Sequence, residues 1–278
     1  MFREALSYPT RKPNGPRSVL LGGGVVFVAS LFGATALLEG SLRYLAVLGV
    51  VPWLFLRGYY VRVVRTAIGR DRPTPPALDD PRRLFRDGLL SLVVSACYLL
   101  PGAVVIGPLV YARAVDADLE TVYADLGLPT ALAEAALSFT DFLALVAAMY
   151  LLGALYATPV AVARFAHADR VRAAFDVRRV VAGALTEDYA VAWAVSLLLQ
   201  GLVFPFAYAF RVVLVGFFLH FVVAVGVRYC YGQGVGAALG LDPVVPDPGG
   251  SDRAEPTPGD SFTPARPRTG EDPLDERR

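Results

Sequence analysis

Two polar side chains interrupt apolar stretches in the C-terminal part of the chain, and their types could support chemistry. Gln200 lies midway along the apolar stretch 190–209, and His220 lies midway along the stretch 212–229. If both stretches are membrane helices, they form an antiparallel hairpin in which the two side chains can meet near the bilayer centre. Imidazole titrates near neutral pH, so the pair could form a proton-responsive or substrate-binding site. The simpler interpretation is a neutral hydrogen bond that joins the two helices, and the sequence favours it.

Arg57 is the one charge that we place within an expected membrane helix, the apolar stretch 44–60. In a cavity, an arginine at this position could bind an anion. Arg57 lies within about one helical turn of the end that is followed by further arginines, and a long side chain can extend from there to the headgroups. The sequence therefore favours a contact between Arg57 and lipid headgroups.

No catalytic or metal-binding motif accompanies these residues. The chain has two histidines and two cysteines, without a CxxC or a His-x-Glu pair, so it lacks the ligand set of a dedicated zinc site. Cys97 and Cys230 fall in or beside apolar stretches, which does not favour a structural disulfide. Ser196 lies one turn before Gln200, but no Gly-x-Ser-x-Gly elbow surrounds it. We expect no metal, no cofactor and no enzymatic activity.

The elements that would hold these side chains are membrane helices. Of the 278 residues, 55% are hydrophobic, and the mean hydropathy is +0.50, which is too apolar for a water-soluble domain. A helix needs roughly 20 apolar residues to cross the hydrocarbon core of a bilayer. Six stretches qualify as spans in this all-α fold, a polytopic helix bundle: 19–38, 44–60, 89–110, 142–162, 190–209 and 212–229.

Prolines fall within four of these six spans. In transporters, broken helices expose backbone groups to a substrate, but prolines also produce plain kinks in packed bundles. The sequence favours kinks at these positions, which are Pro52, Pro101, Pro108, Pro159 and Pro205.

The distribution of Lys and Arg predicts the orientation of the spans. With six spans, 22 basic residues fall on one side of the membrane and three on the other. Cytoplasmic loops retain Lys and Arg, so both termini are expected in the cytoplasm, in a cell membrane. The formal net charge is only +1, which gives no basic field for nucleic acid.

The segments between and beyond the spans have characters of their own. Residues 1–18 form a basic cytoplasmic segment, residues 19–240 the six-helix domain, and residues 241–278 a Pro-rich acidic tail that we expect to be disordered. The stretch 70–80 is broken by prolines, and a helix is expected to begin at 81. Amphipathic helices are expected within 112–141 and 171–185.

Four motifs resemble those of a known family: GYYVRVVR at 58–65, PPALDDPRRLFRDGL at 75–89, TPVAVARFAHADRVRAAFDVRRV at 158–180 and GQGVG at 232–236. They are similar to the archaeal, chiefly haloarchaeal, membrane family catalogued as domain of unknown function 4013. The resemblance covers about residues 1–240. It implies an integral membrane protein without an assigned activity, and it transfers no functional residue.

Two functional classes follow from the sequence. The favoured one is a non-enzymatic membrane component that acts as a scaffold, an assembly factor or a partner subunit of another membrane protein. The alternative is a permease for a small molecule or ion, with a midplane polar site at Gln200 and His220. A permease requires a hydrated cavity at these residues, and a scaffold does not. In either class the cytoplasmic arginines are expected to contact anionic lipid headgroups.

Overall fold

The computed structural model describes residues 2–244, in which helices are joined by turns and loops and no strand occurs. Met1–Val244 forms one compact unit. Six helical segments in this range are long and apolar enough to cross a membrane, which confirms the all-α polytopic fold. Their bounds are Gly15–Leu37, Gly40–Ala67, Pro81–Val115, Thr140–Ala168, Glu187–Val213 and Val215–Leu239.

These segments consist of long α-helices, some extended by short 3₁₀ turns. The first combines α2 (Gly15–Ala34) and η2 (Thr35–Leu37), and the second combines η3 (Gly40–Gly49) and α3 (Val50–Ala67). The other four are α4 (Pro81–Val115), α7 (Thr140–Ala168), α10 (Glu187–Ala209) with η4 (Phe210–Val213), and α11 (Val215–Leu239). α4 and α7 extend beyond the apolar stretches that predicted them at both ends, and α2, α3, α10 and α11 extend beyond theirs at one end, because polar and charged residues can continue the same backbone hydrogen bonds.

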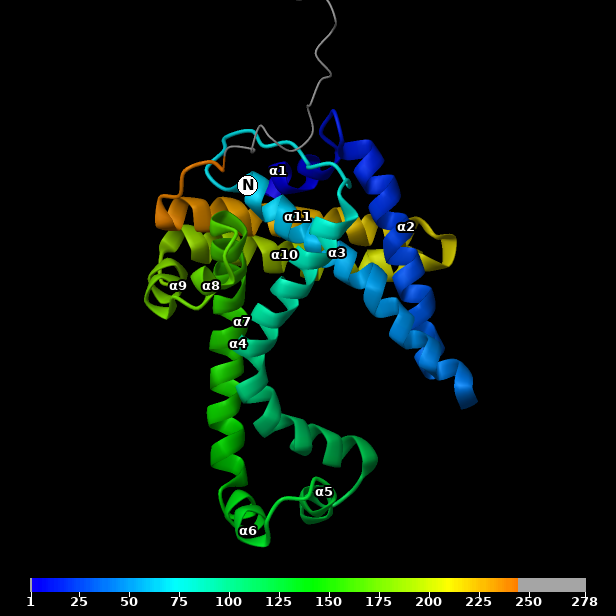
Figure 1. Ribbon diagram of the computed structural model, residues 1–278, viewed down its shortest axis with the longest axis vertical. Helices are drawn as coiled ribbons and strands as arrows, with labels where there is room; N and C mark the ends of the chain where they lie inside the picture. The colour runs from blue at the N-terminus through cyan, green and yellow to red at the C-terminus, as the bar shows by residue number, and fades with distance from the viewer. Residues whose placement is uncertain (1, 245–278) are drawn as a thin grey trace, which may run out of the picture. The chain divides into compact units, whose positions relative to one another are not determined.

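Local sequence explains where α4 begins and where it bends. The Pro-rich stretch before it is not helical, and α4 starts at Pro81 with the side chain of Asp80 accepting a hydrogen bond from the backbone N–H of Arg83. At 35 residues, the helix is about 52 Å long, well over the thickness of a hydrocarbon core. Pro101 and Pro108 lie within it, and its second half turns away from α7 (Figure 1).

Helix α11 is the centre of the packing. Most of its apolar window is buried in the protein, against less than a third for each of the other five spans. Glycines permit close contacts along it. A Cβ on Gly22 or Gly23 of α2 would overlap the rings of Phe221 or Phe218 of α11, and a Cβ on Gly232 would meet Ala67 of α3. The Gly22–Gly23 pair is thus used for close helix approach, as its residue type suggests.

Helices α3 and α4 approach each other even more closely. A Cβ on Gly58 would lie 1.8 Å from the carbonyl oxygen of Leu84, and a Cβ on Gly88 would lie 2.0 Å from that of Leu54. The two glycines therefore face each other's helix, and side chains larger than hydrogen cannot be accommodated without separating the helices.

The α10–α11 hairpin crosses the direction of α4 and α7 instead of running beside them (Figure 1). The crossing is set by what α11 touches. Its first half packs on α2 and its second half on the end of α3, so α11 lies across helices that are themselves side by side. Sequence patterns predict the length and polarity of a span, but the direction of a helix depends on these contacts.

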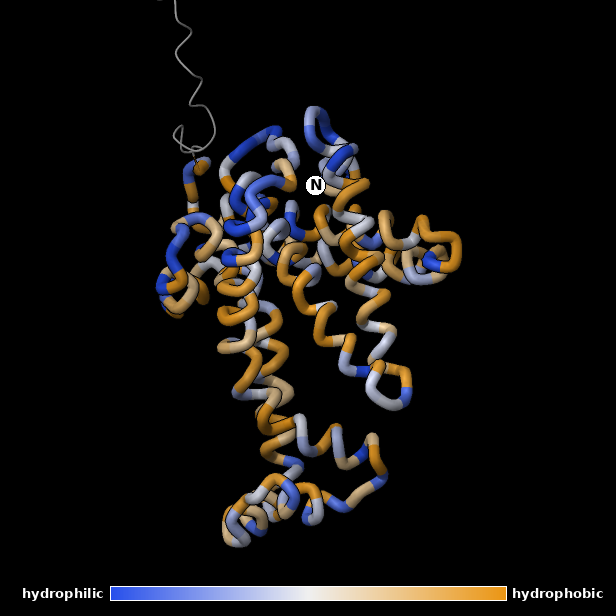
Figure 2. Tube along the Cα trace, turned by 45° about the vertical axis from the view of Figure 1, so that its right-hand side comes forward, coloured by the Kyte–Doolittle hydropathy of each residue, from blue (hydrophilic) through white to orange (hydrophobic). Residues whose placement is uncertain are grey.

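Short helices connect the spans where amphipathic segments were expected. α5 (Leu119–Asp125) and α6 (Thr130–Ser138) join α4 to α7, and α8 (Val171–Ala174) and α9 (Val177–Ala184) join α7 to α10. α5 and α6 lie at the far end of the α4–α7 pair from α8 and α9 (Figure 1). The long helices are largely hydrophobic along their length, whereas the connections collect the hydrophilic residues (Figure 2).

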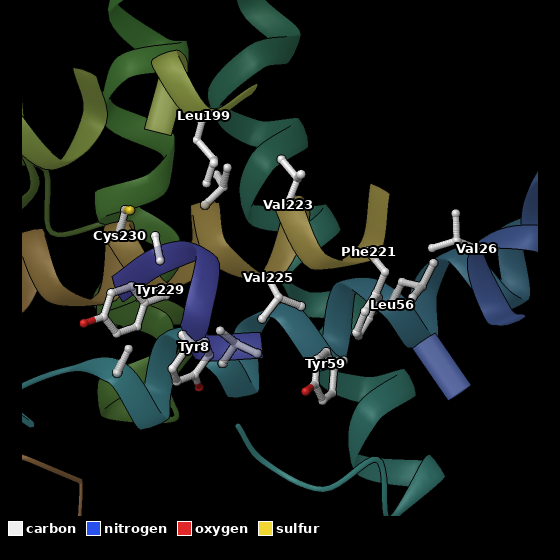
Figure 3. Close-up of a cluster of buried hydrophobic side chains, with 14 of the residues drawn as sticks. Tyr8, Val26, Leu56, Tyr59, Leu199, Phe221, Val223, Val225, Tyr229 and Cys230 are labelled. Carbon is white, nitrogen blue, oxygen red and sulfur yellow. The ribbon is translucent and has the colours of Figure 1, made fainter. Parts of the chain in front are cut away.

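The N-terminal segment is part of the core. α1 (Phe2–Ser7) and η1 (Tyr8–Thr10) precede α2, and Tyr8 is fully buried with its ring 4.8 Å from that of Tyr229. Figure 3 shows Tyr8 in the same cluster as Tyr59, Phe221 and Tyr229, side chains of α3 and α11. The residues described after α11 also pack: Arg70 donates to the carbonyl of Val244. The predicted disorder of the tail concerns mainly residues 245–278, which lie outside the described range.

Candidate ligand cavity between the helices

Two adjoining cavities lie among the long helices, and they share two lining residues, Tyr60 and Arg228. The first, of about 120 Å³, lies between α3, α4, α7 and α11, and the second, of about 340 Å³, lies between α2, α3, α10 and α11. The first is lined by Arg57, Tyr60, Val61, Val64, Ser91, Ser95, Thr158, Pro159, Val162, Arg228 and Tyr231. The polar and aromatic residues of the second are Ser30, Trp53, Tyr60, Gln200, Phe204, Arg211, His220 and Arg228.

Arg57 is held in the wall of the first cavity by α4. Its Nε donates to Ser91 Oγ at 3.2 Å, and its Nη2 donates to the Ser91 carbonyl at 3.1 Å and to Ser95 Oγ at 2.8 Å. The guanidinium also lies 4.9 Å from the centre of the Trp53 ring. The sequence favoured a headgroup contact; the side chain instead turns inward, because two serines one turn apart on α4 offer it acceptors.

Arg228 enters the site from α11, and sequence analysis missed it. The sixth span was expected to end at 229, which put Arg228 at a boundary, but α11 continues to Leu239. Its guanidinium lies 4.9 Å from the centre of the Tyr60 ring. Among residues 2–244 it has no hydrogen bond and no ion pair. One signal could have found it: His220, Ala224 and Arg228 follow each other at four-residue spacing, which places them on one face of a helix.

Gln200 and His220 line the same cavity from neighbouring helices, but no hydrogen bond joins them in the described residues. Gln200 Nε2 donates to the carbonyl of Ser196 on its own helix at 3.1 Å. His220 stacks on Phe204 at 4.9 Å and meets the edge of Tyr208 at 6.1 Å between ring centres. Its Nδ1 is buried and has no partner. Gln200 and His220 thus lie on the same cavity wall, and neither uses the other as a hydrogen-bond partner among the described residues.

A third arginine completes the polar lining at the α10–α11 turn. The Arg211 guanidinium lies 4.0 Å from the centre of the Tyr208 ring and 5.3 Å from that of Phe217. Its Nε is buried without a hydrogen-bond partner. Arg211 is one of the three basic residues that the orientation argument assigned to the side opposite the termini.

The lining of both cavities contains arginines and no Asp or Glu. Other buried arginines of this chain are neutralised by carboxylates. Arg65 Nη1 lies 3.1 Å from Asp87 Oδ2 and its Nη2 lies 3.0 Å from Asp169 Oδ1, while Arg164 Nη2 lies 3.2 Å from Asp176 Oδ2. Since a buried charge is costly unless it is paired, the cavity arginines differ from the structural ones. The cavities therefore present a positive field to whatever enters them.

The other residues considered for chemistry are a serine and two cysteines. Ser196 Oγ donates to the carbonyl of Trp193 at 2.7 Å and is hydrogen-bonded to the Tyr231 hydroxyl at 3.1 Å, with no histidine beside it. Cys97 and Cys230 are both free. No group of three His, Cys, Asp or Glu residues suited to a metal ion is found in the described part of the chain.

A family model described as Protein of unknown function (DUF4013) matches residues 41–213, more than half of the chain. The matched range includes Arg57 and Gln200 and ends before His220 and Arg228. No curated protein and no solved structure matches the chain. The comparisons thus agree with the resemblance seen in the motifs, and they assign no activity to the cavities.

Proposed function

Because the chain belongs to the DUF4013 family of proteins of unknown function, we propose a function from its own cavities: it is a multi-pass membrane permease that takes a small polar molecule or ion between its helices. The observation that carries this proposal is the cavity of about 340 Å³ where Gln200, His220, Arg211 and Arg228 meet. Protein interiors are normally close-packed, so a polar cavity among apolar helices supports ligand binding over packing alone.

The arrangement of the helices is compatible with passage of a ligand. Pro159 lies in the wall of the first cavity, and a proline within a helix removes one backbone hydrogen bond and leaves a carbonyl without its donor. In membrane transporters, such interruptions occur where the backbone lines a water-filled space. The polar side chains of the cavity, which hydrocarbon would not solvate, support a hydrated interior. We propose no enzymatic role.

The experiment that tests the permease is water accessibility of single cysteines in native membranes. In a Cys97→Ser, Cys230→Ser background, we expect Gln200→Cys and His220→Cys to react with a small charged thiol reagent. Two neighbours on α10 serve as matched controls: Leu199 is fully buried and Leu198 is 59% exposed on the outer surface. Neither Leu199→Cys nor Leu198→Cys should react if the bilayer covers that surface. Protection of positions 200 and 220 would refute a hydrated cavity.

A second function, that of a partner subunit or scaffold, is favoured by glycines on open helix surfaces. Gly24, Gly107, Gly153 and Gly201 have no atom outside their own helix within 4 Å of an added Cβ, and small residues of this kind allow another membrane helix to approach. This reading predicts that Gly153→Leu reduces the native mass of the solubilised assembly. An unchanged mass would remove the support that these glycines give to a role as partner subunit or scaffold.

We propose that both termini lie in the cytoplasm and that the chain is placed in the cell membrane of an archaeon. The excess of basic residues in the segments that flank α2, α3, α7 and α11 supports the orientation. Those arginines would contact anionic lipid headgroups. We propose no nucleic-acid partner, since the net charge of +1 gives no general attraction to phosphate backbones.

A further inference from the structure

We propose that the cavity between α3, α4, α7 and α11 binds a small oxyanion, a phosphate, sulfate or carboxylate group, between Arg57 and Arg228. This inference deepens the proposed function, on which it rests, because it names the chemical class of the ligand. The shared chemistry is a compact group with negative oxygens. Two sources can supply it, a free anion in water or the phosphate of a membrane lipid.

Two cations line the first cavity without a counter-ion among the described residues. Arg57 and Arg228 both line a cavity of about 120 Å³, and neither has a carboxylate partner among residues 2–244. Each is half-buried, between helices whose outer faces are apolar. Two uncompensated cations in one poorly solvated space repel each other, and an anion between them would remove both the repulsion and part of the desolvation cost.

The two arginines have N–H donors available for an oxyanion. A guanidinium carries five N–H donors in a rigid plane that matches an oxyanion. The bonds to Ser91 and Ser95 use Nε and Nη2 of Arg57 and leave both donors of Nη1 unused, while they fix the orientation of the group. Arg228 keeps all five donors, and the Tyr60 hydroxyl has no hydrogen-bond partner among the described residues. The Arg57 side of the site is thus oriented before a ligand arrives.

The first cavity is large enough for a small anion and adjoins the larger cavity. A water molecule takes up about 30 Å³ in the liquid, so the first cavity, of about 120 Å³, has room for a small oxyanion. Tyr60 and Arg228 also line the larger cavity, where Arg211 and His220 lie. Arg228 thus lines both cavities, so an anion beside Arg211 and Arg228 in the larger cavity lies next to the cavity that Arg57 lines.

Arg228 permits a test in which loss of the ligand is separate from loss of the fold. Arg228→Gln removes a cation that has no hydrogen bond or ion pair and only the ring contact with Tyr60, so the variant should unfold at nearly the same temperature as the unmodified protein when no oxyanion is present. Arg57→Gln removes bonds to α4 as well and is expected to lower the unfolding temperature slightly. Arg178→Gln, an exposed arginine on α9, is the matched control for a general loss of positive charge.

The measurement is thermal unfolding and calorimetric binding of the full-length protein in dodecyl maltoside with a chloride buffer, titrated with inorganic phosphate, sulfate or acetate. We expect at least one of these anions to raise the unfolding temperature. We further expect its Kd to weaken at least tenfold in Arg228→Gln and Arg57→Gln and to stay unchanged in Arg178→Gln. A separate titration with phosphatidylglycerol distinguishes the sources: stabilisation by this lipid alone would identify a headgroup site.

The proposal is overturned if neither the free anions nor the lipid stabilise the protein, or if Arg178→Gln weakens binding as much as the cavity variants do. It is also overturned if Arg228→Gln lowers the unfolding temperature by itself while anion binding is unaffected, because Arg228 then has a structural role. These results are independent of the permease test. Anion binding with positions 200 and 220 protected from thiol reagents would leave the site standing and refute the permease.

Discussion

At the scale of single residues, the arginines that lie among the long helices of the described chain include two groups that sequence cannot separate. Arg65 donates through Nε to the carbonyl of Ala166 at 2.7 Å and is paired with Asp87 and Asp169, so it joins the ends of α3, α4 and α7. Arg57 and Arg228 have no such carboxylates and face a cavity. Stability should therefore depend on the first group and ligand binding on the second.

Asp87 provides the test of the structural group. Its side chain is 1% exposed and lies between Arg65 and Arg86, so Asp87→Asn leaves a buried arginine with one carboxylate fewer. We expect a loss of about 3–5 kcal/mol in the free energy of unfolding, measured by denaturation in mixed detergent micelles. Asp79, which pairs with Arg62 and is 71% exposed, is the matched control: Asp79→Asn should cost less than about 1 kcal/mol. Equal losses would contradict the distinction.

Tyr8 gives a pH-dependent prediction outside the membrane spans. Burial is the main cause that raises the pKa of its hydroxyl, with a smaller opposing effect from the hydrogen bond to Thr66. A raised pKa in the folded state means that neutral Tyr8 stabilises the fold below pH about 10 and that this stability is lost as the pH rises further. Tyr8→Phe should thus unfold with a weaker pH dependence above pH 10, in the same micelle assay. It should also lose about 1 kcal/mol at neutral pH, because the hydrogen bonds to Thr66 and the Thr74 carbonyl disappear.

At the scale of elements, glycines decide how closely the helices pack. Gly58 and Gly88 bring α3 and α4 together, and this contact aligns Arg57 with the serines of α4. The crossing therefore positions the cavity wall, although neither glycine lines it.

We expect Gly58→Ala and Gly88→Ala to destabilise the protein by about 1–3 kcal/mol through overpacking, since the added methyl group would meet backbone atoms that cannot move aside. Both variants should also weaken anion binding, because separation of the helices displaces Ser91 and Ser95. Gly107→Ala on the same α4 is the control. Nothing lies within 4 Å of its Cβ position, and alanine should leave stability unchanged or slightly improved. The same loss in all three variants would show that helix propensity, not contact, is responsible.

At the scale of the whole molecule, the polar cavities lie within a protein whose outer helix surfaces are apolar. Side chains such as Leu20, Leu145 and Leu152 are more than 60% exposed, as expected of surfaces covered by lipid. The α10–α11 hairpin crosses the α4–α7 pair (Figure 1). The side of the membrane on which the α10–α11 turn lies therefore tests whether both helices cross the membrane.

Val212, at this turn, is 91% exposed. If α10 and α11 both cross the membrane, Val212→Cys in the cysteine-free background should react with an impermeant thiol reagent added outside intact cells. A cysteine at Arg178 should react only after the cells are opened. Reaction of Val212→Cys only in opened cells would place the hairpin on one side of the membrane and reduce the number of crossings.

The sequence by itself determined the class of the protein and the approximate place of its helices. Hydrocarbon requires long apolar helices with satisfied backbone groups, and this requirement can be read from composition and run length alone. The Pro-rich stretch 70–80 and the start of α4 were predicted from the prolines themselves, which break a helix in its interior and are favoured at its first position.

Only the tertiary structure decided the site. Sequence brought Gln200 and His220 to adjacent helices but suggested a bond between them, whereas the structure turns them toward a common cavity. The sequence contains no pattern that associates Arg57 with Ser91, 34 residues later, or with Arg228 on the last helix. Such associations depend on which helix faces meet, and that choice depends on side-chain volumes summed over several helices. The period of an apolar pattern defines a helix face, but not the partner that covers it.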